Sequence, residues 1–159
     1  MTTTLTAATL TVTLKESIEL NGVEQGATNE KTIASINEVS KRIVTVMTAE
    51  AELVAVSTAL SASNAGTFIE GDIRYMRFTN LDDTNFVTLT FKNENSDEFA
   101  IKLDAGYSFV YPADNSGGVV DTMDAIDGTG LTLDYCDLVN VTADANTASC
   151  DMEIFVASV

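Results

Sequence analysis

The chain has 159 residues, of which 45% are hydrophobic, and 24 acidic against 8 basic residues give it a net charge of −16. A domain of this length buries roughly 70% of its unfolded surface, so it can fold without a metal or a disulfide. The absence of histidine excludes Ser-His-Asp and Cys-His catalysis and histidine metal sites. An acidic surface repels phosphate, which disfavours nucleic acid as a partner.

The charge is unevenly distributed. Every Lys and Arg lies between Lys15 and Lys102, whereas residues 103–159 contain ten acidic residues and no basic one. This asymmetry predicts a solvated acidic surface or, alternatively, a partner with a basic face or bound divalent cations.

The N-terminal segment lacks the charged region and continuous apolar core of a secretory signal, and no apolar run approaches the ~18 residues of a membrane-spanning helix. We therefore expect the chain to be made in a reducing cytoplasm. Cys136 and Cys150 flank one predicted hairpin and could face each other across it, but a reduced, buried pair is favoured in that compartment.

The first segments predict an arm and a long strand. Residues 1–9 are rich in Thr and Ala without a burial pattern, which indicates a flexible arm that orders on a neighbour, followed by a single domain over 10–159. Residues 10–20 alternate apolar and polar side chains, so a strand is predicted there, with a bulge near Glu16 and Ser17. Asn21-Gly22 is a strong turn signal.

The next segments are less regular. Residues 32–41 have apolar residues at helical spacing, but Thr, Ile, Asn, Val and Ser dominate residues 23–41, which favours extended structure over a short helix. Strands are predicted over 43–47 and 53–57, and another begins within 66–70.

Residues 73–111 carry the clearest pattern, with four runs of aromatic and β-branched residues separated by polar turns. Large residues alternate within each run, which predicts half-buried strands in an antiparallel meander. The turns are 80–85, 93–97 and 104–106. The alternating residues of the second run are Val87, Leu89 and Phe91.

The remainder predicts a long loop and two closing strands. Residues 112–130 are rich in Gly and Asp, and a loop of this length is usually functional or part of an interface. Residues 138–142 and 150–156 predict a final hairpin. About nine strands without a convincing helix predict an antiparallel β-sandwich, either jelly-roll-like or immunoglobulin-like.

Two clusters of acidic and amide side chains invite a metal reading. Asp121, Asp124 and Asp127 precede a glycine, but the spacing departs from that of an EF-hand, so a solvated acidic loop is favoured over a Ca²⁺ shared with a neighbouring chain. The second cluster, which falls in the turn 80–85, is better explained by capping of a hairpin tip than by cation binding. It consists of Asn80, Asp82, Asp83 and Asn85.

Two arginines and four aromatic residues invite binding roles. Arg74 and Arg77 fall on opposite faces of one predicted strand, so one should pair with an acid at a sheet edge and the other could anchor a partner. The aromatic residues could form a sugar-binding face, but core packing is favoured because tryptophan is absent. They are Tyr75, Tyr107, Phe109 and Tyr111.

Catalytic constellations are missing from the sequence. The 24 acids contain no recognisable glycosidase pair, and no Gly-rich phosphate loop occurs. We therefore expect neither an enzyme nor a bound cofactor.

Three stretches of the chain carry a resemblance. RYMRFTNLDDTNFVTLTF, DEFAIKLDAGYSFVYPA and the closing VNVTADANTASCDMEIFVAS resemble segments of small all-β virion proteins of tailed bacteriophages, particularly marine ones. The resemblance covers residues 66–159, and the first 65 residues add a compatible β-pattern.

The resemblance implies a capsid decoration, or cement, protein on the virion surface. Such proteins bind the outside of a phage head, join neighbouring major capsid protein subunits and often form homotrimers. The alternatives are a tail, neck or fibre-base component and, in another class, a glycan-binding surface adhesin. We expect a partner interface to include Thr2, Thr3, Thr4, Leu5, Arg74, Arg77, Asp121, Asp124 and Asp127.

Overall fold

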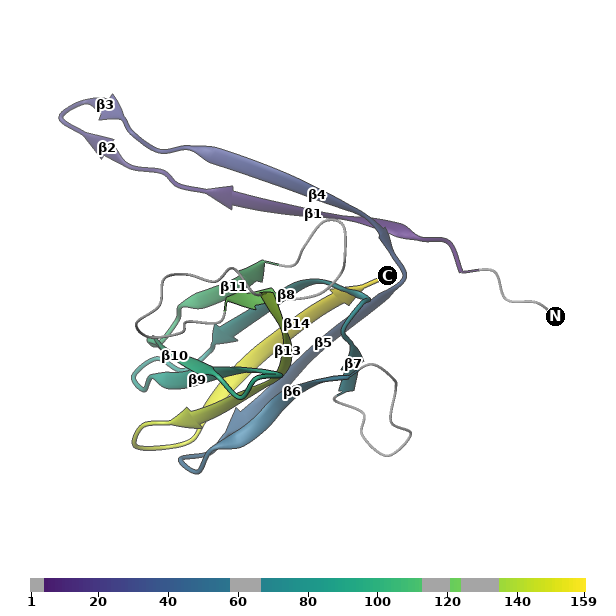
Figure 1. The fold of residues 1–159 in the computed structure, drawn as a ribbon. Coiled ribbons are helices and arrows are strands. Elements are labelled where there is room, and N and C mark those ends of the chain that lie inside the picture. The colour runs from purple at the N-terminus through teal and green to yellow at the C-terminus, as the bar shows by residue number, and fades with distance from the viewer. Residues whose placement is uncertain (1–4, 58–66, 113–120, 124–134) are drawn as a thin grey trace, which may run out of the picture.

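The computed structural model describes residues 5–57, 67–112, 121–123 and 135–159, and all regular structure within them is β-strand. Two mainly antiparallel sheets pack face to face around a common core, and a long two-stranded hairpin projects from them (Figure 1). The predicted β-sandwich class is confirmed.

The sandwich has a four-stranded and a six-stranded sheet. The strand order of the first is β11 (Ser108–Pro112), β8 (Ile73–Asn80), β14 (Cys150–Ser158) and β5 (Glu38–Val46). The order of the second is β10 (Glu98–Leu103), β9 (Val87–Asn93), β13 (Tyr135–Ala145), β6 (Ala51–Ser57) and β7 (Thr67–Ile69), with β12 (Asp121–Met123) also paired to β13.

The antiparallel pairs are nested along the chain. β5 pairs with β14, β6 with β13, β8 with β11, and β9 with β10. The first strand of the sandwich therefore pairs with the last, and the innermost two form the tight hairpin. The eight strands therefore pair as in one long hairpin that has been folded over. Successive pairs along this hairpin lie alternately in the four-stranded and the six-stranded sheet.

The predicted meander over 73–111 is wrong in its pairing. β9 and β10 form the predicted hairpin, but β8 and β11 pair with each other in the opposite sheet. The turns 80–85 and 104–106 therefore carry the chain across the core between sheets. A period of two identifies the buried face of a strand but does not identify its neighbour, and Asn, Asp and Gly suit both kinds of connection.

The predicted closing hairpin over 138–142 and 150–156 is wrong for the same reason. β13 pairs with β6 and β9, whereas β14 pairs with β5 and β8. The connection after Ala145 crosses between the sheets. Cys150 pairs in register with Val46 near that crossing, while Cys136 lies nine residues before Ala145, which is about 30 Å along a strand. The two cysteines are therefore not cross-strand neighbours in a hairpin, as the prediction had allowed.

The predicted alternation of buried residues is confirmed. Val87, Leu89 and Phe91 are fully buried, and their neighbours Thr88 and Thr90 lie on the other face of β9. In β14 the buried set is Met152, Ile154 and Val156. Alternate side chains of both sheets thus meet in one apolar core.

Residues 5–36 do not enter this core. β1 (Ala8–Lys15) pairs with β4 (Thr28–Ile36), and β2 (Glu19–Leu20) pairs with β3 (Val23–Glu24). We call this hairpin, residues 8–36, the arm. Its second strand settles the ambiguous segment as extended structure, as predicted. Residues 1–4 lie outside the described part of the chain, so the flexibility of 1–9 stays a prediction.

The arm turns at the predicted Asn21-Gly22. Both residues have positive φ, 53° and 78°, as a tight turn of right-handed twist requires. Below it, β1 ends at the predicted irregularity, where the Glu24 carboxylate accepts hydrogen bonds from the amides of Ile18 (3.1 Å) and Gly26 (2.7 Å). The two strands approach so closely that only glycine fits at position 26.

We expect Gly26→Ala to loosen the arm beyond β1. A Cβ at this position would lie 2.2 Å from the Glu16 carbonyl oxygen, and overpacking of this kind costs about 1–3 kcal/mol. Amide exchange of Glu16, Ile18 and Gln25 should accelerate about tenfold or more, with the sandwich unaffected. Gly71→Ala, where a Cβ meets nothing within 4 Å, is the control. Equal exchange rates in the two variants would contradict the close approach.

Candidate interaction surface

The base of the arm packs on the outer face of the four-stranded sheet, which is the face turned away from the core. Leu10, Val12 and Ile33 of the arm contact a small cluster formed by Ile36, Tyr75, Phe155 and Ala157. Tyr75 and Phe155 meet edge to face with their centroids 5.9 Å apart. Because these contacts are apolar and buried, they fix the direction in which the arm leaves the sandwich.

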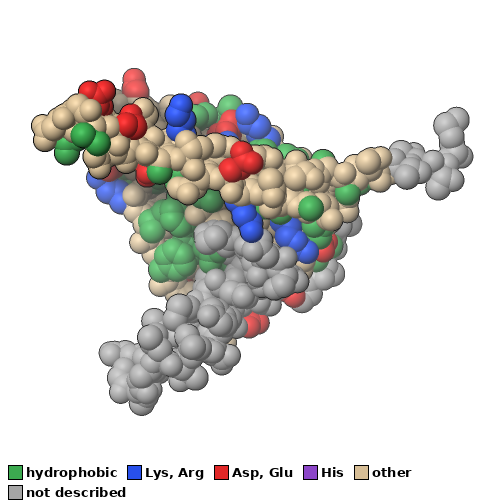
Figure 2. All heavy atoms as spheres, turned by 90° about the horizontal axis from the view of Figure 1, so that it is seen from above, with side chains coloured by type: hydrophobic (Ala, Val, Ile, Leu, Met, Phe, Trp, Pro, Cys, Tyr) green, Lys and Arg blue, Asp and Glu red, His purple; other side chains and the backbone are tan. Residues whose placement is uncertain are grey.

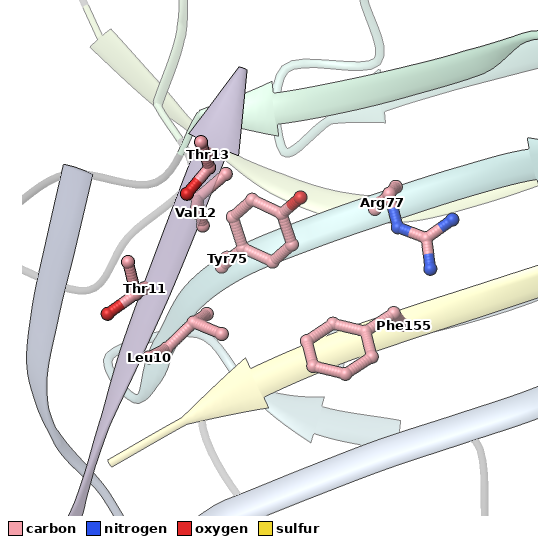
Figure 3. Close-up of a pocket in the computed structure, with 7 residues that line it drawn as sticks. All are labelled: Leu10, Thr11, Val12, Thr13, Tyr75, Arg77 and Phe155. Atoms are coloured by element: carbon pink, nitrogen blue, oxygen red, sulfur yellow. The ribbon is translucent and has the colours of Figure 1, made fainter. Parts of the chain in front are cut away.

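A groove of about 240 Å³ runs between β1 and the outer face (Figure 3). Leu10 and Val12 form its arm wall, while Tyr75, Arg77 and Phe155 rise from β8 and β14 to form its floor. Burial raises the pKa of the Tyr75 hydroxyl, and the nearby Arg77 charge opposes that shift. Most of the residues that line the groove also hold the arm to the sheet, so the groove does not form a separate ligand site.

An ionic network crosses the outer face beside the groove. Glu153 accepts a hydrogen bond from Arg77 on one side and pairs with Lys41 at 2.9 Å on the other. Arg77 also donates to the Thr79 hydroxyl, which bonds Ser108 at 2.8 Å. These contacts, with the Arg77 hydrogen bond the largest cause, lower the pKa of the Glu153 carboxyl. The network links all four strands of the sheet.

We expect Glu153→Gln to destabilise the protein at neutral pH by about 1 kcal/mol, the upper end of the range for ion pairs at a protein surface. A carboxyl whose pKa is lower in the folded state stabilises the fold above its unfolded pKa of about 4.3, and this stabilisation disappears as the pH falls through the folded pKa. Denaturant unfolding of both proteins should therefore differ at pH 7 and converge at acid pH.

The matched control for that prediction is Asp104→Asn. Asp104 pairs with Lys102 at 2.7 Å, but both side chains are more than half exposed, so we expect almost no change in unfolding free energy. A Glu153→Gln difference that persists at acid pH would show that packing, rather than charge, accounts for it.

Beyond the base, the arm carries uncovered apolar side chains. We call residues 14–24 the arm tip. Leu14, Ile18, Leu20 and Val23 are each 55–61% exposed. Leu14 continues the row of Leu10 and Val12 past the supporting sheet, and hydrophobic side chains are visible at the free end of the arm in Figure 2. A two-stranded hairpin has no second layer of its own, so it cannot bury these residues.

A second uncovered apolar set follows β5. Val39 and Ile43 are 53% and 61% exposed on the outer face, and Met47, just past the strand, is 57% exposed. β5 is nine residues long and forms an edge of its sheet. Long edge strands with apolar side chains are sites where other chains pair.

The other long sheet edges are better protected. β11 ends at Pro112, which lacks an amide hydrogen, and β10 carries Glu98 and Lys102 in ion pairs with neighbouring residues. Among the described edge strands of the two sandwich sheets, β5 is therefore the one best suited to association.

The predicted interface residues are placed as follows. Arg77 pairs with an acid, as one arginine was expected to, although at the centre of the sheet rather than at its edge. Arg74 lies at an irregularity of β8 and donates to the carbonyls of Gly71 (2.9 Å) and Ile73 (3.3 Å). Leu5 is 66% exposed. Any partner contacts of these residues stay predictions.

The structure does not describe the side chains of the remaining predicted interface residues. Asp121 contributes its backbone to β12, opposite Asp137. Thr2, Thr3, Thr4, Asp124 and Asp127 lie outside the described residues. Both predictions for residues 121–127, a solvated acidic loop and a shared Ca²⁺ site, therefore stay predictions.

The capping interpretation of the 80–85 turn is confirmed. Asp82 Oδ1 accepts the amides of Thr84 (2.8 Å) and Asn85 (2.5 Å), and Asn80 Oδ1 accepts the amide of Asp82 at 3.0 Å. The hydrogen bond from Asn85 is the largest cause of a lowered pKa at Asp82. The loop crosses between sheets, however, and is not the predicted hairpin tip.

The four aromatic residues do not form one face. Phe109 and Tyr111 pack on Phe91, with ring centroids 5.3 and 5.1 Å from it. Tyr75 lies beneath the arm on the opposite face of the sheet, and Tyr107 is 67% exposed. Burial by packing is thus confirmed for Phe109 and Tyr111 in the main core and for Tyr75 in the cluster beneath the arm, and the four rings do not form the common face that a sugar platform would need.

Other features give little chemistry. Cys150 is a buried free thiol whose pKa is raised by burial. Within the described residues, no group of three acidic or cysteine side chains could hold a metal ion. No helix that could span a membrane occurs in this part of the chain either.

Comparison with protein-family models, with curated proteins and with solved structures finds no match to the chain. We therefore infer function from the chain's own geometry. The features most suggestive of function are the arm tip and β5, and sequence reasoning missed both. A usable signal was present: residues 10–20 alternate cleanly, but 23–35 supply Val23 and Ile33 as their only large apolar residues, too few for a strand of the core.

Proposed function

We propose that this chain is a structural virion protein that decorates the outside of a phage head and joins major capsid protein subunits. The observation that carries the proposal is the arm: a hairpin fixed at its base, with uncovered apolar side chains at its tip. An apolar projection that its own domain cannot cover is suited to binding a neighbouring protein.

We further propose that the sandwich is a jelly roll rather than an immunoglobulin-like fold. The nested pairs support this, since β5·β14, β6·β13, β8·β11 and β9·β10 are the pairs expected when one long hairpin is wrapped into two sheets. Jelly rolls recur in viral capsid and lectin domains, so the fold is compatible with the proposed role.

The net charge supports an outward position. At −16, the protein would be repelled by the DNA inside a head but not by a surface with basic residues. Together with the resemblance of residues 66–159 to small virion proteins, this favours the outer face of the shell.

Binding to purified heads tests the proposal. We expect the protein to bind expanded heads of its own phage at several hundred copies per particle and to raise the temperature at which they rupture. About a dozen copies per virion would instead indicate the neck or tail, and glycan binding by the isolated chain would favour the adhesin. Failure to bind heads and absence from purified virions would overturn the proposal.

A truncation separates the contribution of residues 1–9 to head binding from that of the rest of the arm. We expect deletion of residues 1–9 to leave the melting temperature within about 2 °C, because residues 5–9, the described part of this segment, are exposed and supply little buried surface. The same deletion should weaken head binding about tenfold if the segment adds a strand to a neighbour. Undiminished binding would remove residues 1–9 from the interface and leave the rest of the arm as its candidate.

A further inference from the structure

We propose that the arm tip of one copy binds the outer face of the four-stranded sheet of a second copy, along β5. The association is head to tail, because a different surface is used on each partner. This inference deepens the proposed function by naming how copies of the chain would join on a head.

The first argument is continuity with a contact that already exists. The row Leu10, Val12, Leu14 lies on one face of β1. Its first two members are covered by Tyr75 and Phe155 of the outer face, while Leu14 and the residues beyond it have nothing beneath them. The surface that covers the start of this row is therefore the outer face of this sheet, and another copy offers the part of that face that its own arm leaves uncovered, along β5.

The second argument is that the outer face has matching uncovered positions. Val39 and Ile43 of β5 and Met47 just past its end are spaced four residues apart, and Leu14 and Ile18 have the same sequence spacing on the arm. Lys41 lies between Val39 and Ile43 on the same face. Its ammonium group points away from the sheet edge, toward Glu153 of the neighbouring strand β14 at 2.9 Å, and so does not cover the two apolar side chains. The apolar side chains are thus left at the margin of the sheet, next to its unpaired edge.

The third argument is that one copy cannot satisfy both surfaces itself. The base contacts hold the arm over β8 and β14, and the tip lies far from β5 of the same chain (Figure 1). A contact between unlike surfaces leaves one free tip and one free face at the ends of a chain of copies. It therefore closes into a ring, such as the expected trimer, or grows as a filament.

Sedimentation of the full-length protein tests the inference. We expect the wild type to sediment at a multiple of its 16.9 kDa mass. The tip variant Leu14→Ser/Leu20→Ser and the face variant Ile43→Asp should each be monomeric at the same concentration. Val139→Asp is the matched control, since it adds the same charge at an exposed position of the six-stranded sheet and should leave the oligomer intact.

Mixing the two variants gives the sharper result. The face variant keeps a working tip and the tip variant keeps a working face, so their mixture should form a heterodimer with one contact, although neither variant associates alone. Far-UV circular dichroism spectra should match that of the wild type, because the three substituted positions, Leu14, Leu20 and Ile43, are exposed.

Three outcomes would overturn the inference. They are a wild type that is monomeric up to its solubility limit, an oligomer that survives Ile43→Asp, and a mixture of variants that stays monomeric. An arm that pairs only with another arm gives the second outcome. A monomeric wild type that still binds heads would sink this inference alone and leave the proposed function standing.

Discussion

Phe91→Ala is expected to lower the free energy of unfolding by about 3–5 kcal/mol, the range for removal of a buried aromatic ring. Phe91 is fully buried at the centre of β9. Four rings surround it, and the substitution would leave a cavity between the two sheets. The closest is the stacked ring of Phe99, with centroids 4.8 Å apart, and the others belong to Phe78, Phe109 and Tyr111.

Denaturant titration of the variant measures this loss. Phe91→Leu, which keeps part of the volume, should cost about 1–2 kcal/mol and provides a reading if the alanine variant does not fold. Phe99→Ala is the matched control, because the Phe99 ring stacks on Phe91 itself but is 42% exposed, so its removal should cost less than Phe91→Ala. An alanine variant at position 91 with an unchanged melting temperature would contradict the core described above.

That ring cluster illustrates what local sequence could predict. The alternation of Val87, Leu89 and Phe91 identifies the buried face of β9 without knowledge of any partner, because successive side chains of a strand point to opposite faces. The same reasoning correctly assigned β14. It depends only on residues within one strand, which is why it succeeded.

Strand pairing depends on contacts that the alternation does not encode. β8 and β9 are joined by a short Asn- and Asp-rich turn, and adjacent strands usually pair, yet the chain crosses the core there. The pairs that define the sandwich join distant strands such as β5 and β14. No local feature of either strand specifies the other, so the meander and the closing hairpin were predicted wrongly.

The candidate interaction surface was out of reach for a related reason. Leu14, Ile18 and Leu20 have the alternation of a core strand, and only their position beyond the supporting sheet leaves them exposed. A sequence pattern reports that one face of a strand is apolar, but it does not report whether the same chain covers that face. The residues that the prediction placed in one long alternating strand are thus the ones best placed to bind a neighbour.

Asn80→Ala is expected to cost about 3–5 kcal/mol, since it removes three hydrogen bonds of about 1 kcal/mol each and one of them, to the Leu103 carbonyl, is buried, where a lost partner costs about 1–3 kcal/mol. The Asn80 side chain is fully buried. Its Nδ2 donates to the carbonyls of Asn85 (2.8 Å) and Leu103 (3.2 Å), and its Oδ1 accepts the amide of Asp82 (3.0 Å). One residue thereby joins the end of β8 to the crossing loop and to the end of β10.

The comparison variant is Asn93→Ala, the other buried asparagine in the core region. Asn93 Oδ1 accepts the amide of Asp97 at 2.8 Å within a single hairpin, so its loss should cost only about 1–2 kcal/mol. If both variants lost the same stability in denaturant titrations, the role of Asn80 in joining the two sheets would be contradicted.

Thermal melts of the wild type and Asn80→Ala distinguish capping from cation binding at the 80–85 loop. The side-chain oxygens Oδ1 of Asn80 and Asp82 accept hydrogen bonds from backbone amides, which leaves fewer lone pairs to coordinate a metal ion. The wild type should therefore melt at the same temperature with Ca²⁺ and with EDTA, and Asn80→Ala should show its full loss in both. A melting temperature that falls in EDTA, with a smaller effect of the variant there, would instead mean that the loop holds a cation and that part of the loss is lost binding.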